Sequence, residues 1–205
     1  MQLRMPIIAM LAIVLGWGAA AWADEPPAQT LVRDTTDKVV SALKRERDAI
    51  EADPERLYTL VDEIVLPHFD FVRMSQRVLG KYWRDASDEQ QQRFAREFQA
   101  LLVRTYATAL QEYRDQTIRF LPSRERPGGD EVSVRTEVEQ PGGPPIPISY
   151  EMTRVGEAWK VFDVAIDGVS LVINYRSTFA NEIRQKGIDG LIERLQAHNR
   201  EKRGA

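Results

Sequence analysis

The sequence has 205 residues, with 28 Lys and Arg against 31 Asp and Glu, two histidines and no cysteine. The lack of cysteine excludes disulfides, thiol chemistry and a lipid-modified N-terminal cysteine, and two histidines cannot build a histidine-rich metal site. The slightly acidic, evenly mixed charge is not typical of a nucleic-acid-binding protein.

Residues 1–23 have the pattern of a secretory signal peptide. Arg4 supplies a positive charge, residues 6–19 form a short apolar run, and Ala21 and Ala23 are small residues at a cleavage site. The apolar run is short for a membrane span of about 20 residues. We therefore expect cleavage after Ala23 and a single soluble, exported domain over residues 24–205.

Helical periodicity begins near residue 29 and continues to residue 114. Apolar residues from Val32 to Ile50 recur at helical spacing, which predicts one long helix. Asp53-Pro54 is a typical helix start, and Pro67 is expected to end the helix that follows.

Two further helices are indicated by their capping residues. Asp70 and Gly80 bound a short helix. Ser87 and Gln90 form a capping box at the start of the longest helix, which is expected to reach about Arg114. Its apolar positions repeat at steps of three and four: Phe94, Phe98, Leu101, Leu102, Thr105, Tyr106, Ala109, Leu110 and Tyr113.

Residues 115–166 alternate between apolar and polar side chains in four runs, separated by Gly- and Pro-rich turns at 127–130 and 141–145 and by Gly156-Glu157. This pattern predicts a four-stranded antiparallel meander. Its apolar face is predicted to contain Ile118, Phe120, Val132, Val134, Val138, Ile146, Ile148, Tyr150, Met152, Phe162, Val164 and Ile166.

The last strand passes into a helix at Asp167-Gly168, where the apolar period changes from 2 to 3.6. Either Asp167 or Ser170 can cap this helix. It is expected to end near Gly187, and Asp189 can cap a final helix, so helices occupy residues 168–199. Helices, then strands, then helices indicate an α+β domain with helices covering one face of the sheet.

Few residues are candidates for chemistry. His68 stands close to Asp70 and could form an acid–base pair, although an ordinary loop histidine is the favoured interpretation. Asp163 and Asp167 could form a carboxylate pair, but structural roles in the turn and cap are favoured. Ser170 lies outside any nucleophile elbow, and no phosphate-binding loop motif is present. We expect neither an enzyme nor a metal site.

Several segments together resemble the MlaC family of phospholipid-binding proteins, also known as the toluene-tolerance family. The most specific are WKVFDVAIDGVSLVINYRSTF at Trp159–Phe179 and KGIDGL at Lys186–Leu191. The segments Val65–Asp70 and Leu79–Trp83, and the end of the long helix at Tyr106–Tyr113, match in order. The resemblance therefore covers essentially the whole chain after the signal peptide.

This resemblance implies a twisted antiparallel sheet of the nuclear-transport-factor-2 type, wrapped by six or seven helices around an apolar lipid cavity. It also implies a monomeric, non-enzymatic periplasmic carrier whose cargo is phospholipid and which needs no cofactor. Such carriers work between an inner-membrane ABC transporter complex and an outer-membrane lipoprotein–porin complex and maintain outer-membrane lipid asymmetry. The sequence leaves direction and head-group preference open.

The facing apolar stripes suggest which residues contact the lipid in such a carrier. The expected lining consists of Phe98, Leu102 and Tyr106 on the long helix, Ile148, Tyr150 and Val164 on the sheet, and Val169 and Leu171 after the last turn. Two alternatives stay open. One is a small-molecule enzyme of the same fold type that uses His68, Asp163 and Tyr150, and the other is a peptide-binding assembly factor.

Overall fold

The computed structural model describes residues 25–122 and 129–201. The predicted signal peptide with its cleavage site, the first half of the predicted turn at 127–130 and the last four residues lie outside this part of the chain. Among the helices in the described part, none combines the length and apolar character that crossing a membrane requires.

The first helices are shorter than the sequence predicts. They are α1 (Pro27–Arg45), α2 (Arg47–Ala52), α3 (Glu55–Ile64) and the 3-10 helix η1 (Leu66–His68). The prediction of one helix through Ile50 is wrong, because the chain breaks at Glu46, whose carboxylate pairs with Arg45 and Arg56. The break folds α2 and α3 back, so that Ile50 and Leu57 pack into the same apolar cluster as α1. Tertiary packing has overridden local periodicity here.

Of the next four helices, the two that were predicted from caps begin where those caps predict. The four helices are α4 (Phe71–Leu79), α5 (Lys81–Asp85), α6 (Asp88–Tyr106) and α7 (Thr108–Gln111). The Asp70 side chain accepts a hydrogen bond from the Arg73 backbone N–H at 2.9 Å, and both hydrogen bonds of the Ser87 capping box are present. The long helix ends at Tyr106 rather than near Arg114.

The sheet is an antiparallel meander of five strands, in the order β1-β2-β3-β4-β5. The strands are β1 (Ile118–Phe120), β2 (Glu131–Val138), β3 (Ile146–Val155), β4 (Ala158–Ile166) and β5 (Val169–Ser170). The fifth strand was not predicted. Asp167 and Gly168 have φ values of 51° and 77°, so they form a two-residue hairpin turn with both residues left-handed.

A β-bulge in β4 changes which side chains share a face. Tyr150 is paired with Val164, but Met152 is paired with Val161, so Phe162 is an extra residue in β4. The prediction that Phe162 shares the apolar face with Val164 is therefore wrong, because the bulge reverses the alternation. We call the predicted face, with Val161 in place of Phe162 and with Thr136 added, the inner face.

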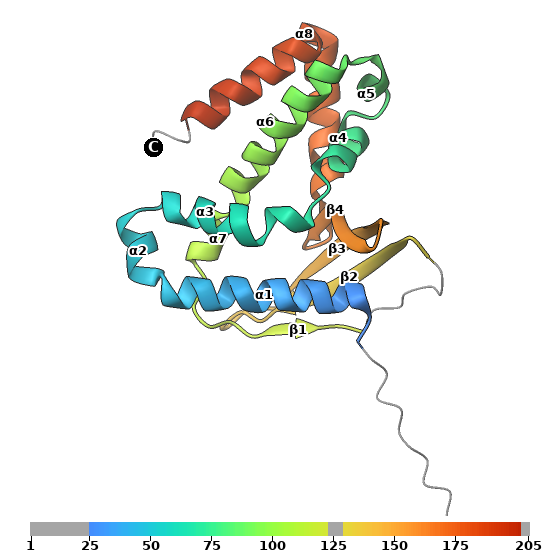
Figure 1. Ribbon diagram of the computed structural model, residues 1–205. Helices are drawn as coiled ribbons and strands as arrows, with labels where there is room; N and C mark the ends of the chain where they lie inside the picture. Colours follow the sequence, from blue (N-terminus) through green and yellow to red (C-terminus); the bar gives the residue numbers. More distant parts are fainter. Residues whose placement is uncertain (1–24, 123–128, 202–205) are drawn as a thin grey trace, which may run out of the picture.

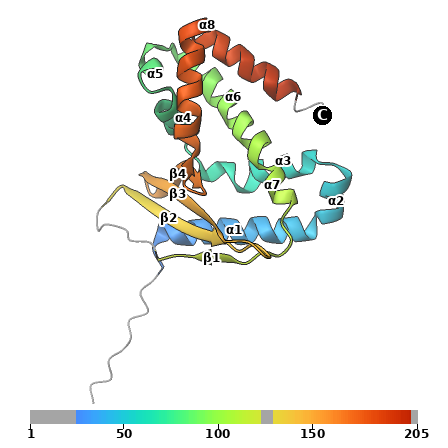
Figure 2. The same ribbon diagram turned by 180° about the vertical axis from the view of Figure 1, so that it is seen from behind.

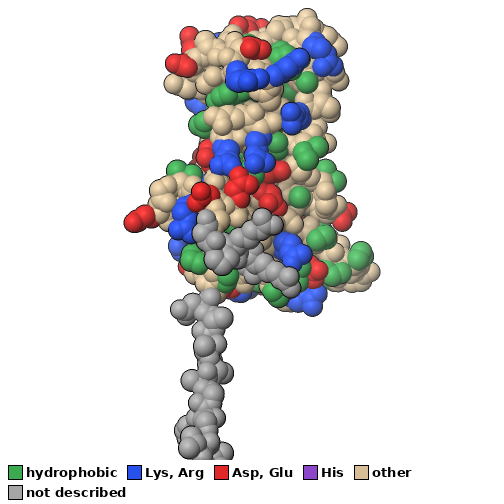
Figure 3. Space-filling model, turned by 90° about the vertical axis from the view of Figure 1, so that its right-hand side faces the viewer, with side chains coloured by type: hydrophobic (Ala, Val, Ile, Leu, Met, Phe, Trp, Pro, Cys, Tyr) green, Lys and Arg blue, Asp and Glu red, His purple; other side chains and the backbone are tan. Residues whose placement is uncertain are grey.

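The ring of Phe162 instead packs under α4. The guanidinium carbons of Arg73 and Arg77 lie 4.6 and 4.1 Å from its centre, and Arg73 also donates to the Thr153 hydroxyl from the opposite face of the sheet. Both arginines pair with Glu131. Basic and acidic side chains accordingly meet between the helices and the sheet in Figure 3.

The chain ends in α8 (Leu171–Glu201), which is interrupted at Gly187 with φ 72° and ψ 176°. The predicted separation of two helices at this glycine is confirmed. Asp189, predicted to cap the second half, accepts hydrogen bonds from Gln90 and Arg93 and so fixes this half to the start of α6.

These elements surround two apolar clusters. The main cluster joins the sheet to α1, α4, α6 and α8, and the second joins the end of α1 to α2, α3 and Ala107. Figures 1 and 2 show α1 lying along the sheet, with α4, α6 and α8 stacked beyond its β4 end. The cation of Arg33 in α1 lies 4.0 Å from the centre of the Phe120 ring, on the inner face.

Candidate functional site

The carboxylate of Asp163 is engaged at the start of α8. One oxygen accepts a hydrogen bond from the Val172 backbone N–H at 3.2 Å, and the other accepts one from the Ser170 hydroxyl. Ser170 in turn accepts from the Ile173 N–H at 3.0 Å, so Ser170 caps the helix and Asp167 does not. With both oxygens used in this way, Asp163 has a structural role, and the geometry does not support a catalytic pair with Asp167.

His68 and Asp70 do not form an acid–base pair. The Asp70 carboxylate caps α4. The pKa of His68 is lowered, first by burial and then by the positive charges of Lys160 and Lys38, so its charged neighbours are basic. Within the described residues, no group of three histidine or carboxylate side chains is arranged to hold a metal ion. The side chains around His68 therefore form a basic region rather than a catalytic centre.

The inner face brings together the three predicted sheet residues. Tyr150 lies opposite Val134 and Val164, and Ile148 lies opposite Thr136. Burial raises the pKa of the Tyr150 phenol, yet both Tyr150 and Ile148 keep some accessible surface. Because α1 covers this face, we interpret that surface as bordering an internal apolar space.

The predicted helix residues differ in how much surface they offer. Phe98 is fully buried, and its ring centre lies 5.7 Å from those of Tyr175 and Phe179 in α8. Leu102 is nearly buried, whereas Tyr106 is only partly buried, and burial and Tyr175 raise its pKa. The structure thus places Phe98 within the α6–α8 contact and Tyr106 at its margin.

The two residues predicted after the last turn point to different environments. Val169 on β5 is 55% exposed, whereas Leu171, the first residue of α8, is 7% exposed and belongs to the main cluster. Only Leu171 therefore contacts the interior. Val169 lies at the surface of the outermost strand.

Sequence patterns did not reveal a groove between α1 and α3. It contains two adjoining hollows of about 350 and 300 Å³, which share Ala42, Arg45 and Ile64. The remaining lining residues are Asp37, Lys38 and Ser41 in the first, and Glu46, Arg56, Thr59, Leu60 and Glu63 in the second. The small side chain of Ala42 on the buried side of α1 was the one available signal. The groove has an apolar base and a rim of mixed charge.

Comparison with known proteins gives a consistent result. The family described as "MlaC protein" matches residues 33–197. The intermembrane phospholipid transport system binding protein MlaC of Haemophilus influenzae is 29% identical over 84% of this chain and 82% of its own. The toluene tolerance protein ttg2D of Pseudomonas putida is 30% identical over 78% of this chain and 74% of its own.

A solved structure is also similar over most of the chain. It is the phospholipid-binding protein from Ralstonia solanacearum, determined in complex with a phospholipid. It is 34% identical, with a TM-score of 0.79 over 85% of this chain and 98% of the other. The agreement therefore extends from short motifs to the arrangement of nearly all described elements.

Proposed function

Because this chain belongs to the MlaC family, a family of non-enzymatic lipid carriers, we propose that it carries a phospholipid through the periplasm with the acyl tails held against the inner face of its sheet. The observation that carries the proposal is the inner face itself. It is apolar, it is covered by α1, and Ile148 and Tyr150 still keep accessible surface there. The phospholipid in the similar structure from Ralstonia solanacearum supports the same cargo class.

The hydrophobic effect explains why such a carrier must enclose the tails. A two-tailed lipid has roughly 30 methylene groups, and hiding them from water is worth on the order of 20–25 kcal/mol at about 0.8 kcal/mol per group. Escape into water is then negligible, whereas transfer into another apolar site exposes little surface. A docked partner is therefore needed for loading and release.

We assign the tail contacts to the predicted residues that border the interior: Leu102, Tyr106, Ile148, Tyr150 and Val164. Phe98 and Leu171 do not contact the tails in this proposal. Phe98 packs on Tyr175 of α8, and Leu171 packs in the main cluster, so both stabilise the tail-contacting residues. Val169, at the surface of β5, is placed at the rim rather than among the tail-contacting residues.

The groove between α1 and α3 is the natural entrance. Its hollows of about 350 and 300 Å³ are at the low end of ligand pockets, which span roughly 300–1,000 Å³. Two acyl tails need more room, so loading requires α1 and α3 to move apart. The second apolar cluster, which joins these two helices, is where that movement is resisted.

The proposed partners are membrane complexes at either side of the periplasm. We propose that the chain, as a monomer, exchanges lipid with an inner-membrane ABC transporter complex and an outer-membrane lipoprotein–porin complex. The Haemophilus influenzae relative is a binding protein of an intermembrane phospholipid transport system, which supports this assignment. The direction of transfer is then set by the relative affinities of the partners and by their ATP use.

Native mass spectrometry of the exported chain, purified without detergent, tests the proposal. We expect one phospholipid per chain. Ile148→Trp should fill the inner space and abolish bound lipid, whereas Ser149→Trp, the next residue on the same strand, points to the opposite face and should keep it. Circular dichroism checks that both variants fold. A wild-type chain without lipid that turns over a small substrate would establish the enzyme alternative instead.

A further inference from the structure

Three basic residues, Lys38, His68 and Lys160, come from three elements, and Lys38 lines the α1–α3 groove. The chain leaving η1 runs along β4, because Phe69 pairs with Val161 and the Asp70 N–H donates to the Val161 carbonyl at 2.8 Å. This pairing places His68 close to Lys160. The Lys160 ammonium donates to the carbonyl of Pro67, the residue directly before His68.

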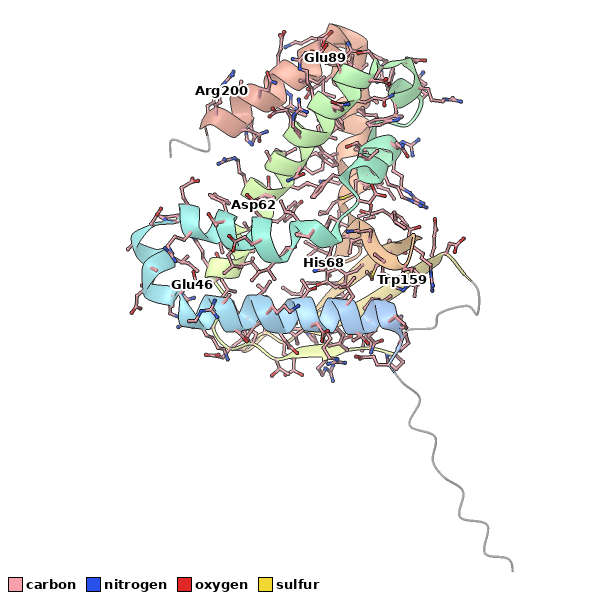
Figure 4. All side chains as sticks on the ribbon, in the orientation of Figure 1. Glu46, Asp62, His68, Glu89, Trp159 and Arg200 are labelled. Carbon is pink, nitrogen blue, oxygen red and sulfur yellow. The ribbon has the colours of Figure 1, made fainter. Side chains whose placement is uncertain are left out.

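The third base comes from α1. Lys38 lines the first hollow of the groove, and Figure 4 shows His68 between η1 and α1. Lys38 and Lys160 are both close enough to help lower the pKa of His68, after the larger effect of burial. His68 is thus influenced by both lysines, of which Lys38 lines the groove.

These bases resemble more than half of the lysines and arginines among the described residues in having no carboxylate partner. Among the described residues, Lys38, His68 and Lys160 form no ion pair, whereas Lys44 on the same helix pairs with Asp115 at 2.7 Å. Positive side chains held near one another without a paired carboxylate attract anions. Asp37, which also lines the first hollow, limits the positive potential without pairing with it.

We propose that Lys38, His68 and Lys160 bind the phosphate of the phospholipid head group at the entrance of the groove. This inference rests on the proposed carrier function and adds a polar contact to it. A phosphodiester offers a negative charge and acceptor oxygens, which suit two ammonium donors. His68, kept neutral at pH 7 by its lowered pKa, supplies a ring N–H as a third donor.

A competition between two lipids isolates the phosphate. The exported chain is incubated with phosphatidylglycerol vesicles that also contain diacylglycerol with the same acyl chains, and mass spectrometry gives the ratio of the two bound lipids. The test variant is Lys38→Gln/Lys160→Gln. The control, Lys44→Gln/Lys81→Gln, has the same charge change but alters lysines that contact Asp115 and the Tyr82 ring.

We expect the ratio of bound phosphatidylglycerol to bound diacylglycerol to fall roughly 3–30-fold in the test variant and to stay unchanged in the control. An unchanged ratio in the test variant, or an equal loss of both lipids, would overturn the phosphate site while leaving the carrier function intact. If the wild-type chain bound neither lipid, the proposed function itself would fail.

A second measurement separates head-group phosphate from free phosphate. The ring resonances of His68 are followed by NMR in the lipid-free chain as inorganic phosphate is added, and again after loading with phosphatidylglycerol. We expect a shift on loading and none with submillimolar inorganic phosphate. Saturable binding of inorganic phosphate in that range would make the cluster a free-phosphate site and would refute the head-group assignment.

Discussion

Replacing Asp163 should destabilise the fold by loosening α8 from the sheet. The substitution Asp163→Ala removes the acceptor for both the Val172 N–H and the Ser170 hydroxyl, in a residue that is only 8% exposed. A hydrogen bond to a charged group contributes about 1.5–3 kcal/mol, and a donor left buried without a partner costs about 1–3 kcal/mol. Water can reach part of this helix start, so we expect a loss of about 3 kcal/mol in the free energy of unfolding.

Urea and thermal unfolding of the lipid-free chain measure this loss. A decrease of about 3 kcal/mol corresponds to a fall in Tm of about 6–12 °C for a chain of this size. Asp163→Asn keeps one acceptor but loses the charge at the helix N-terminus, so it should cost about 1.5 kcal/mol.

The matched control is the other aspartate of the turn. Asp167→Asn should change stability by less than about 0.5 kcal/mol, because Asn tolerates a positive φ and the Asp167 side chain does not cap α8. The reasoning would be refuted if Asp163→Ala unfolded at the wild-type midpoint, or if Asp167→Asn were equally destabilising.

Two further predictions concern pH and backbone strain. Because the pKa of His68 is lowered in the fold from its ordinary value of 6.5, the unfolded chain takes up the proton first, and stability should decline as the pH falls below 6.5. His68→Gln should flatten this slope in urea unfolding across that range, and identical slopes would contradict the assignment. Gly187→Ala should cost about 1–3 kcal/mol, because φ 72° with ψ 176° is open only to glycine. Thermal unfolding against Gly143→Ala, where no positive φ is needed, checks this, and equal midpoints would contradict it.

The elements that sequence reasoning located correctly are those with local signals. The capping box at Ser87, the cap at Asp70 and the break at Gly187 each depend on a few neighbouring residues, and the structure shows all three. Strands β1 to β4 were visible through alternation. β5 was not, because two residues are too few to display a period.

The errors arose where distant contacts decide the structure. The first helix ends at Arg45, and the next residue, Glu46, pairs with Arg56 on another helix, a contact that periodicity does not report. Likewise, the bulge at Phe162 accompanies contacts of its ring with α4 arginines that are far away in the sequence.

For the candidate site, sequence reasoning was more reliable on the sheet than on the helices. Alternation correctly grouped Tyr150 with Val164, since a covered sheet has one inner face. A helical stripe is less informative, because α6 has several neighbours. The apolar stripe of α6 could not show that Phe98 packs on α8. The stripe of α1 could not show that Ala42 leaves a groove beside α3.

The register of β4 makes the number of residues in this strand more important than the number of residues in an exposed turn. Removing Phe162 would restore simple alternation and keep Val161 opposite Met152 on the inner face, but it would take away the ring beneath the α4 arginines. Removing a residue of β4 away from the bulge would instead turn the side chains before it to the opposite face. A residue gained or lost in the connection at 141–145 would only lengthen or shorten an exposed turn. We therefore expect strand β4 to accept substitutions more readily than insertions or deletions.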